Sequence, residues 1–291
     1  MSALEPPRDA VTEAVRRALA EDLTPLGDIT SMLLPPAQAR AQLVPRVAGV
    51  LAGRACVTET FGQVDPSVEI TWDAFDGDDL DAGQAFATVD GELSSILTAE
   101  RTALNFCSHL SGVATATRLL VDAVEASGGG ARVWDTRKTT PGLRSLEKAA
   151  VRAGGGANHR GNLSDWVLLK DNHLALLGIT EAVAGARHRW PARTVHVECD
   201  TVAQAREAIE AGADALLLDN MSPQQVTECV ALAAAAGADR RPLLEVSGGI
   251  TADTIGAYAA LGIDCISVGA ITNSAPVLDI GLDIAPSAGG R

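Results

Sequence analysis

Short apolar runs recur through the second part of the chain. They span residues 131–135, 166–170, 194–199, 215–219, 243–247 and 265–269. Alanine-rich sequence of helical character separates them, and from the second run on the starts lie roughly 20 to 30 residues apart. Strands that alternate with helices at this spacing pair in parallel, and runs that are apolar on both faces are typical of strands buried on both sides. The pattern predicts six or seven strand–helix units around a parallel sheet.

The first part of the chain has a different pattern. Strands are predicted around 41–52, 68–75 and 85–89, and helices over 9–22, 54–64 and 99–126, the last as one helix or two. Gly/Asp turns such as DGDD and DAGQ separate the strands. We therefore expect an α+β arrangement of about 100 residues ahead of the parallel units.

Almost every apolar run of the second part ends in a polar residue or a glycine. The ends, in chain order, are Asp135 with Arg137 and Lys138 behind it, Lys170, Glu198, Asp219, Ser247 and Gly269. The carboxyl ends of barrel strands converge on one mouth that carries the active site, whereas an open sheet binds ligands mainly at one switch point. Six such ends favour a barrel. Because fewer than eight units are visible, we expect an incomplete one.

The basic residues concentrate in one window of an acidic chain. The net charge is −14 over 291 residues, yet 137–170 holds seven Lys/Arg against two acids, and all three lysines lie within it. Lysine offers a compact charge suited to phosphate, and arginine a planar fork suited to carboxylate. This mixture predicts a small substrate with several anionic groups. A solvated helix face with ion pairs explains part of the window equally simply, and we prefer it for Arg144, Glu147, Lys148 and Arg152.

Other strand ends leave more than one interpretation open. The glycines after Ser247 and at Gly269 suit a phosphate, because glycine lets backbone N–H groups approach it, although a lone glycine pair is commonly only a turn. Glu198 and Asp219 could hold ribose hydroxyls, bind Mg²⁺ or stabilise a cationic transition state. The alternative for this region is helix N-capping, by Asp200 in one loop and by Asp219 or Asn220 in the next.

Composition disfavours several classes of protein. Five widely spaced cysteines form no CxxC motif, so we expect no disulfide scaffold and no zinc site but reduced core residues in a cytoplasmic protein. The chain contains no apolar stretch of the roughly 18 residues a membrane span needs, and it begins without a secretory signal pattern. The acidic balance argues against nucleic-acid binding.

Six motifs together resemble one family. DTRKTTPGLR (135–144), GGGANHR (154–160), LLKDNH (168–173), LLLDN (216–220), EVSGGI (245–250) and ISVGAIT (266–272), in this order, are similar to the quinolinate phosphoribosyltransferases. The likeness runs from GDIT (27–30) and ERTALNF (100–106) to near residue 284. It implies an α/β sandwich over 1–112, completed by 275–291, and an incomplete six- or seven-stranded α/β barrel of the type II phosphoribosyltransferases over 113–274. It also implies homodimers or larger assemblies with shared active sites.

The resemblance implies a role for each matching position. Quinolinate would be bound by Arg101 from the neighbouring subunit and by Thr136, Arg137, His159, Arg160 and Lys170. Phosphates of phosphoribosyl pyrophosphate would contact Lys138, Ser247, Gly248, Gly249 and Gly269. Glu198 and Asp219 would face the ribose and a Mg²⁺ cofactor, directly or indirectly, and would act with Lys138 in catalysis. Asn273 stands where the family often has histidine.

The implied reaction belongs to NAD biosynthesis. Quinolinate and phosphoribosyl pyrophosphate would give nicotinate mononucleotide, CO₂ and pyrophosphate. Two other hypotheses stay open: a relative that uses another pyridine or anionic acceptor, such as the molybdenum-associated branch, and a non-catalytic sensor of phosphorylated metabolites. Two carboxylates beside a phosphate loop argue against a sensor, because they repel anions unless a metal or a cationic state offsets them.

Overall fold

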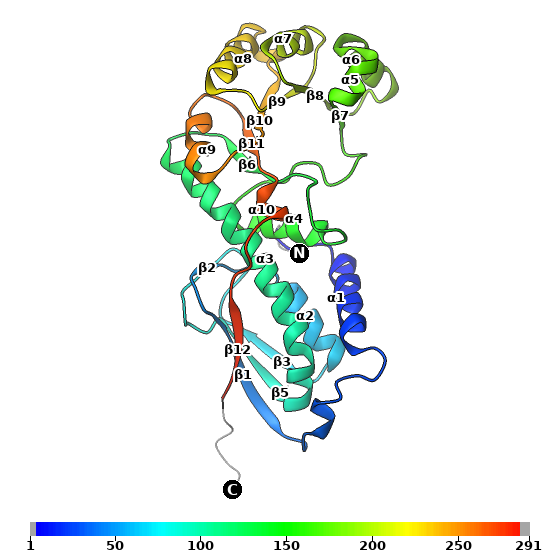
Figure 1. Ribbon diagram of the computed structural model, residues 1–291, viewed down its shortest axis with the longest axis vertical. Coiled ribbons are helices and arrows are strands. Elements are labelled where there is room, and N and C mark those ends of the chain that lie inside the picture. The colour runs from blue at the N-terminus through cyan, green and yellow to red at the C-terminus, as the bar shows by residue number, and fades with distance from the viewer. Residues whose placement is uncertain (1–3, 286–291) are drawn as a thin grey trace. The chain divides into compact units, whose positions relative to one another are not determined.

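The computed structural model describes residues 4–285, which form two compact units (Figure 1). The first comprises Met1–Arg118, Thr139–Gly155 and Ala270–Arg291, and the second comprises Leu119–Lys138 and Gly156–Gly269. The chain thus leaves and re-enters the first unit twice. These units group residues by contact, and the domain boundaries expected from the sequence stay predictions. No helix within 4–285 combines the length and the apolar character that crossing a bilayer requires.

An antiparallel sheet of four strands organises the first unit, in the order β12-β1-β5-β3. Its strands are β1 (Gln38–Pro45), β3 (Glu69–Trp72), β5 (Ala87–Glu92) and β12 (Ile280–Ala285), and β2 (Gly49–Val50) pairs separately with β4 (Asp79–Leu80). Its helices are α1 (Arg8–Leu23), η1 (Ser31–Leu33), α2 (Arg54–Val64), α4 (Arg144–Ala153), α10 (Ala270–Asn273) and most of α3 (Leu93–Ala126). Buried residues of the sheet such as Leu43 and Val89 share a core with Phe61 of α2 and Ile96 of α3.

Three expectations for this unit need correction. The strand predicted over 41–52 is two strands, β1 and β2, and the sequence patterns did not indicate β4. Helix α4 is not a solvated face: Glu147 and Lys148 are buried. Glu147 is held by an ion pair with His109 Nε2 at 2.8 Å and by the Thr140 N–H, so this carboxylate is compensated inside the protein.

Six parallel strands form the second unit, in the order β6-β11-β10-β9-β8-β7. They are β6 (Arg132–Trp134), β7 (Val167–Leu169), β8 (Val195–Cys199), β9 (Ala215–Asp219), β10 (Leu243–Ser247) and β11 (Cys265–Ser267). The helices around them are α5 (Asp171–Leu177), α6 (Ile179–Arg189), α7 (Val202–Glu210), α8 (Pro223–Ala235), η2 (Ala238–Arg240) and α9 (Ala252–Ala259). Among the described residues β6 pairs with β11 but not with β7; a single parallel bridge, Trp134–Ala157, lies beside β6 instead. The predicted α/β fold with an incomplete barrel is confirmed, with six strands.

Local chemistry decides where the barrel helices begin. Thr201 caps α7 and Ser222 caps α8, each in a capping box completed by the glutamine three residues later. The N-capping roles considered for Asp200, Asp219 and Asn220 are therefore wrong. The five cysteines are buried and unbonded, as expected for core residues.

Candidate active site

The second unit contains a cavity of about 370 Å³ at the carboxyl ends of its strands. It is lined by Thr136, Arg137, Lys138, His159, Arg160, Leu168, Lys170, Glu198, Leu217, Asp219, Glu245, Ser247 and Ser267. Nine of these thirteen side chains are candidates named from the sequence, and the structure brings them together in one pocket. Leu168, Leu217, Glu245 and Ser267 were missed.

The pleat of the strands explains this lining. Residues two apart on a strand point to the same face, so Leu217 and Asp219 enter the cavity together, as do Glu245 and Ser247. In the parallel register Ser247 lies beside Asp219. A polar residue at a strand end therefore predicts a second lining residue two positions earlier, a signal that could have found Glu245.

Lys170 and Glu198 form a close ion pair inside the cavity. Glu198 is nearly buried, whereas the Lys170 side chain is half exposed. A buried carboxylate needs such a compensating charge. Two residues expected to bind different parts of the substrates thus neutralise each other's charge.

Asp219 occupies a less favourable environment for charge. Burial raises its pKa, and the charge of Glu198 adds to this effect, while Lys170 and Lys138 oppose it. The Asn220 side-chain amide donates to Asp219 Oδ2 at 2.6 Å. A cation that arrives in the pocket would therefore be attracted by Asp219 more than by the already paired Glu198.

The glycine loops are built around close contacts. A Cβ on Gly248 would lie 2.2 Å from Asn220 Oδ1, and its φ of +101° is itself a glycine conformation. A Cβ on Gly269 would lie 2.8 Å from Lys138 Cδ. At Gly249 space is open, and only the φ of +61° favours glycine. Gly269 therefore makes room for Lys138 at the end of the cavity expected to bind phosphate.

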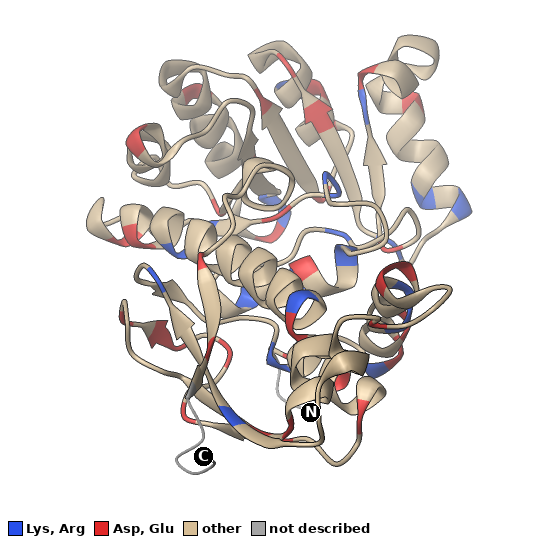
Figure 2. Ribbon diagram, turned by 60° about the horizontal axis from the view of Figure 1, so that its bottom comes forward, with Lys and Arg blue, Asp and Glu red and all other residues tan. Residues whose placement is uncertain are grey.

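The cavity is also lined by two guanidinium groups, of Arg137 and Arg160, and by the imidazole of His159. Arg160 is buried, and its pKa is lowered by burial and by the charge of Arg137, partly offset by Asp165 and Glu245. Two guanidinium groups that repel each other in a half-enclosed pocket favour an anionic ligand between or beside them. Over the whole chain, by contrast, Asp and Glu outnumber Lys and Arg by 37 to 23 (Figure 2).

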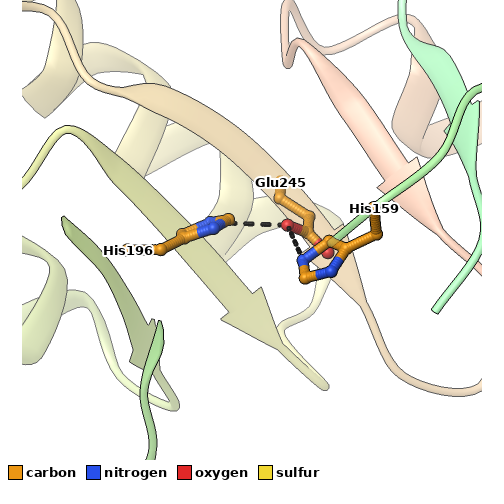
Figure 3. Close-up of side chains that lie close together, drawn as sticks. All are labelled: His159, His196 and Glu245. Atoms are coloured by element: carbon orange, nitrogen blue, oxygen red, sulfur yellow. Dashed lines mark ion pairs between the residues drawn. The ribbon is translucent and has the colours of Figure 1, made fainter. Parts of the chain in front are cut away.

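His159 also belongs to a buried cluster with His196 and Glu245 (Figure 3). The Nε2 atoms of both histidines lie 3.4 Å from Glu245 Oε2. Sequence reasoning missed His196 and Glu245 because each stands within an apolar run. The available signal was a charged residue in the middle of a strand predicted to be buried on both faces.

Gly248, Gly249 and Gly269 are not among the residues that line the pocket, and two further candidates lie in the first unit. Arg101 is an exposed residue of α3 in the first unit, where it lines a different cavity with Thr102 and Asn105. Its assignment to a neighbouring subunit's site stays a prediction. Asn273 lies on α10 in the first unit, and the Ser274 hydroxyl donates to its Oδ1 at 2.6 Å.

Comparison with known proteins gives matches over nearly the whole chain. The family models described as quinolinate phosphoribosyl transferase, N-terminal domain and C-terminal domain, match residues 28–111 and 113–283. The nicotinate-nucleotide pyrophosphorylase (carboxylating) of Mycobacterium leprae is 41% identical over 289 residues, covering 95% of this chain and 98% of that protein. The probable enzyme of that name from Bacillus subtilis is 41% identical, covering 89% and 88%. The solved structure of the nicotinate-nucleotide pyrophosphorylase from Francisella tularensis has a TM-score of 0.91 at 39% identity, covering 97% and 98%.

Proposed function

The chain belongs to the quinolinate phosphoribosyltransferase family, and we propose that its barrel pocket carries out that family's reaction. The enzyme is a pentosyltransferase that transfers the phosphoribosyl group of phosphoribosyl pyrophosphate to quinolinate, with decarboxylation, in NAD biosynthesis. The products are nicotinate mononucleotide, CO₂ and pyrophosphate. The observation that carries the assignment of the site is the gathering of four Lys/Arg side chains and three carboxylates in one cavity of about 370 Å³.

The two groups of cations divide the substrates between them. The guanidinium groups of Arg137 and Arg160 suit planar carboxylates, so this end binds the quinolinate dicarboxylate together with Thr136, His159 and Lys170. Lys138 and the glycine loops at Gly248, Gly249 and Gly269, with Ser247, bind the phosphates. Binding of the substrate carboxylate would draw Lys170 from Glu198, which frees that carboxylate when the second substrate is present.

Glu198 and Asp219 act on the sugar. Displacement of pyrophosphate at ribose C1 by the quinolinate nitrogen develops positive charge on the sugar, and two nearby carboxylates stabilise that charge. Once the ring nitrogen is quaternised, the adjacent carboxylate leaves as CO₂. The electron pair of the broken bond stays on the ring carbon, where the neighbouring positive nitrogen stabilises it, and that carbon takes up a proton from solvent water. The protein's contribution is positioning and charge complementarity, with Lys138 at the departing phosphates.

The pocket also fits a magnesium ion. Mg²⁺ prefers oxygen ligands, keeps several waters and binds through one or two carboxylates together with substrate phosphates. Asp219 and Glu198 supply those carboxylates in the same cavity as Lys138 and Ser247, which we propose as phosphate contacts. Among residues 4–285, Asp219 forms no ion pair as close as that of Glu198 with Lys170. When bound, the ion would neutralise the leaving pyrophosphate.

The assembly and location follow from the same assignment. We propose a homodimer or larger assembly in which Arg101 of one subunit completes the quinolinate end of its partner's pocket. Buried, unbonded cysteines fit a reducing compartment, so we propose a cytoplasmic enzyme.

One assay tests the function directly. The purified chain is supplied with phosphoribosyl pyrophosphate, Mg²⁺ and either quinolinate or nicotinate, and CO₂ and mononucleotide are measured. We expect both products with quinolinate, and calorimetry should find nicotinate bound at least about tenfold more weakly, since it lacks one carboxylate. Equal binding of the two acids would contradict recognition of a dicarboxylate, and mononucleotide without CO₂ would favour the relative that uses another acceptor.

A further inference from the structure

Glu245 is a fully buried carboxylate on β10 whose side chain lines the proposed active site. An ionised group without water is costly unless opposite charge and hydrogen-bond donors compensate it. No Lys or Arg contact to Glu245 is among the ion pairs of residues 4–285; its contacts are the two imidazoles of His159 and His196, each 3.4 Å away. This distance is that of an ion pair rather than of a tight hydrogen bond.

The balance of effects keeps Glu245 ionised. Burial by itself would raise its pKa, but the interactions with His159, His196 and Ser267 outweigh burial, so the pKa lies below its ordinary value. An ionised Glu245 in turn favours positive charge on its neighbours. It acts in this direction on Arg160, whose buried guanidinium is otherwise disfavoured by Arg137.

His159 is held from several directions. Its backbone N–H donates to Asp135 Oδ1 at 2.8 Å, and its ring packs edge-on against Trp134 and Trp166, with centroids 5.8 and 4.9 Å away. Glu245 contacts the Nε2 side of the ring (Figure 3). The tryptophans restrict the ring by packing, and Glu245 adds a polar contact at Nε2 that favours one orientation of the ring.

We propose that Glu245 is a positioning residue for quinolinate, which orients the His159 imidazole against the wall of the pocket at the end where the substrate carboxylates bind. This inference rests on the proposed function. A carboxylate thereby strengthens an anion site, because it holds in place a side chain that lines the site. The same three side chains could instead hold a divalent metal ion. The neighbouring Arg160 charge disfavours that alternative.

The test is Glu245→Gln, which keeps the shape and removes the charge. We expect the KM and calorimetric Kd for quinolinate to rise roughly tenfold or more, with the KM for phosphoribosyl pyrophosphate changed less than about threefold. The matched control is Glu147→Gln, a fully buried glutamate that also contacts a histidine but lies in the first unit; its quinolinate KM should stay at the wild-type value. If Glu245 had only a structural role, Glu245→Gln would weaken the binding of both substrates together or would lower only the thermal stability.

A double-mutant cycle identifies the residue through which Glu245 acts. His159→Gln alone and the double variant should show the same quinolinate affinity, because the charge of Glu245 no longer matters once the imidazole is absent. In ¹⁵N spectra, Glu245→Gln should change the ring-nitrogen signals of His159 at neutral pH. If Glu245→Gln does not fold, Glu245→Asp replaces it, with a smaller but still quinolinate-selective loss.

Three results would overturn the inference. They are unchanged quinolinate binding in a folded Glu245→Gln, additive losses in the cycle, and a stoichiometric metal ion in the purified wild type that both Glu245→Gln and His196→Gln remove. Failure of the proposed function is a separate outcome, because the wild type itself would then yield no mononucleotide from quinolinate.

Discussion

The ammonium of Lys170 and the carboxylate of Glu198 are joined in an ion pair across two neighbouring barrel strands. Lys170 follows β7, and Glu198 lies within β8. Neither is a spare surface charge, because both line the cavity and Glu198 is nearly buried. The Glu198 carboxylate offsets the positive charge of Lys170. The pair also links a residue proposed to bind the substrate carboxylates to a residue proposed to act on the sugar.

Lys170→Ala should therefore damage more than one step. It removes a quinolinate contact and leaves Glu198 buried without its partner, which costs about 2–5 kcal/mol in comparable buried pairs. We expect kcat/KM for quinolinate to fall by a factor of at least about 30. Lys148→Ala is the matched control: it removes the buried lysine of α4 in the first unit and should lower stability while kcat/KM stays near wild type. Similar kinetic losses in the two variants would contradict the role given to Lys170.

Gly269→Ala tests the phosphate end. The new methyl group would lie 2.8 Å from Lys138 Cδ, so the lysine must shift. We expect the KM for phosphoribosyl pyrophosphate to rise several-fold with little change in melting temperature, since the clash is with a flexible side chain. Gly185→Ala in helix α6, where no atom lies within 4 Å of the added carbon, should instead stabilise the protein by up to about 1 kcal/mol and leave kinetics unchanged. An unaltered KM for phosphoribosyl pyrophosphate in Gly269→Ala would contradict a role of Lys138 in phosphate binding.

His196 makes stability depend on pH. Burial lowers its pKa from 6.5 to about 4, with smaller opposing effects from Glu245. Between these values the unfolded chain binds a proton that the folded chain does not, so stability should be complete above pH 6.5 and fall as the pH drops toward 4. The loss attributable to this group between pH 7 and pH 5 is about 2 kcal/mol.

Urea unfolding at the two pH values measures this effect. His196→Gln should flatten the dependence, whereas His188→Gln, at an exposed position of α6, should keep the wild-type slope. An unchanged slope in His196→Gln would show that other groups cause the acid sensitivity.

Complementation tests the shared site. Arg101→Ala and Lys170→Ala chains, each inactive alone, are unfolded together and refolded as a mixture. If Arg101 serves the partner's pocket, half of the sites in each mixed dimer, and so about a quarter of all sites after random pairing, should carry both intact residues and recover activity. Refolding either variant with itself is the control. Absence of recovery in assemblies shown by mass spectrometry to be mixed would assign Arg101 to its own subunit.

The sequence was most informative where local pattern decides structure. Helix α2 matches its predicted range of 54–64, and all six apolar runs of the second part contain strands. Periodicity and turn residues act within a few positions, so these elements could be predicted. The residues at the strand ends likewise gave six of the nine predicted side chains that line the pocket, because parallel strands bring their carboxyl ends to one mouth.

Other features depend on which distant segments meet. Strand β12 pairs with β1 across more than 230 residues, from Arg40 with Ala285 to Pro45 with Ile280, and no local pattern specifies that partner. The burial of Glu147 depends on His109 of another helix, so its helical spacing suggested a surface role.

By itself, the sequence determined the two types of architecture, the barrel strands and the set of anion-binding residue types, because these follow from periodicity and side-chain chemistry. Only the tertiary structure decided that Lys170 pairs with Glu198, that Gly269 makes room for Lys138 and that Glu245 lies between His159 and His196. The physical reason is that burial and charge pairing are properties of neighbours in space. A buried charge takes its function from the partner that compensates it, and that partner is chosen by the fold.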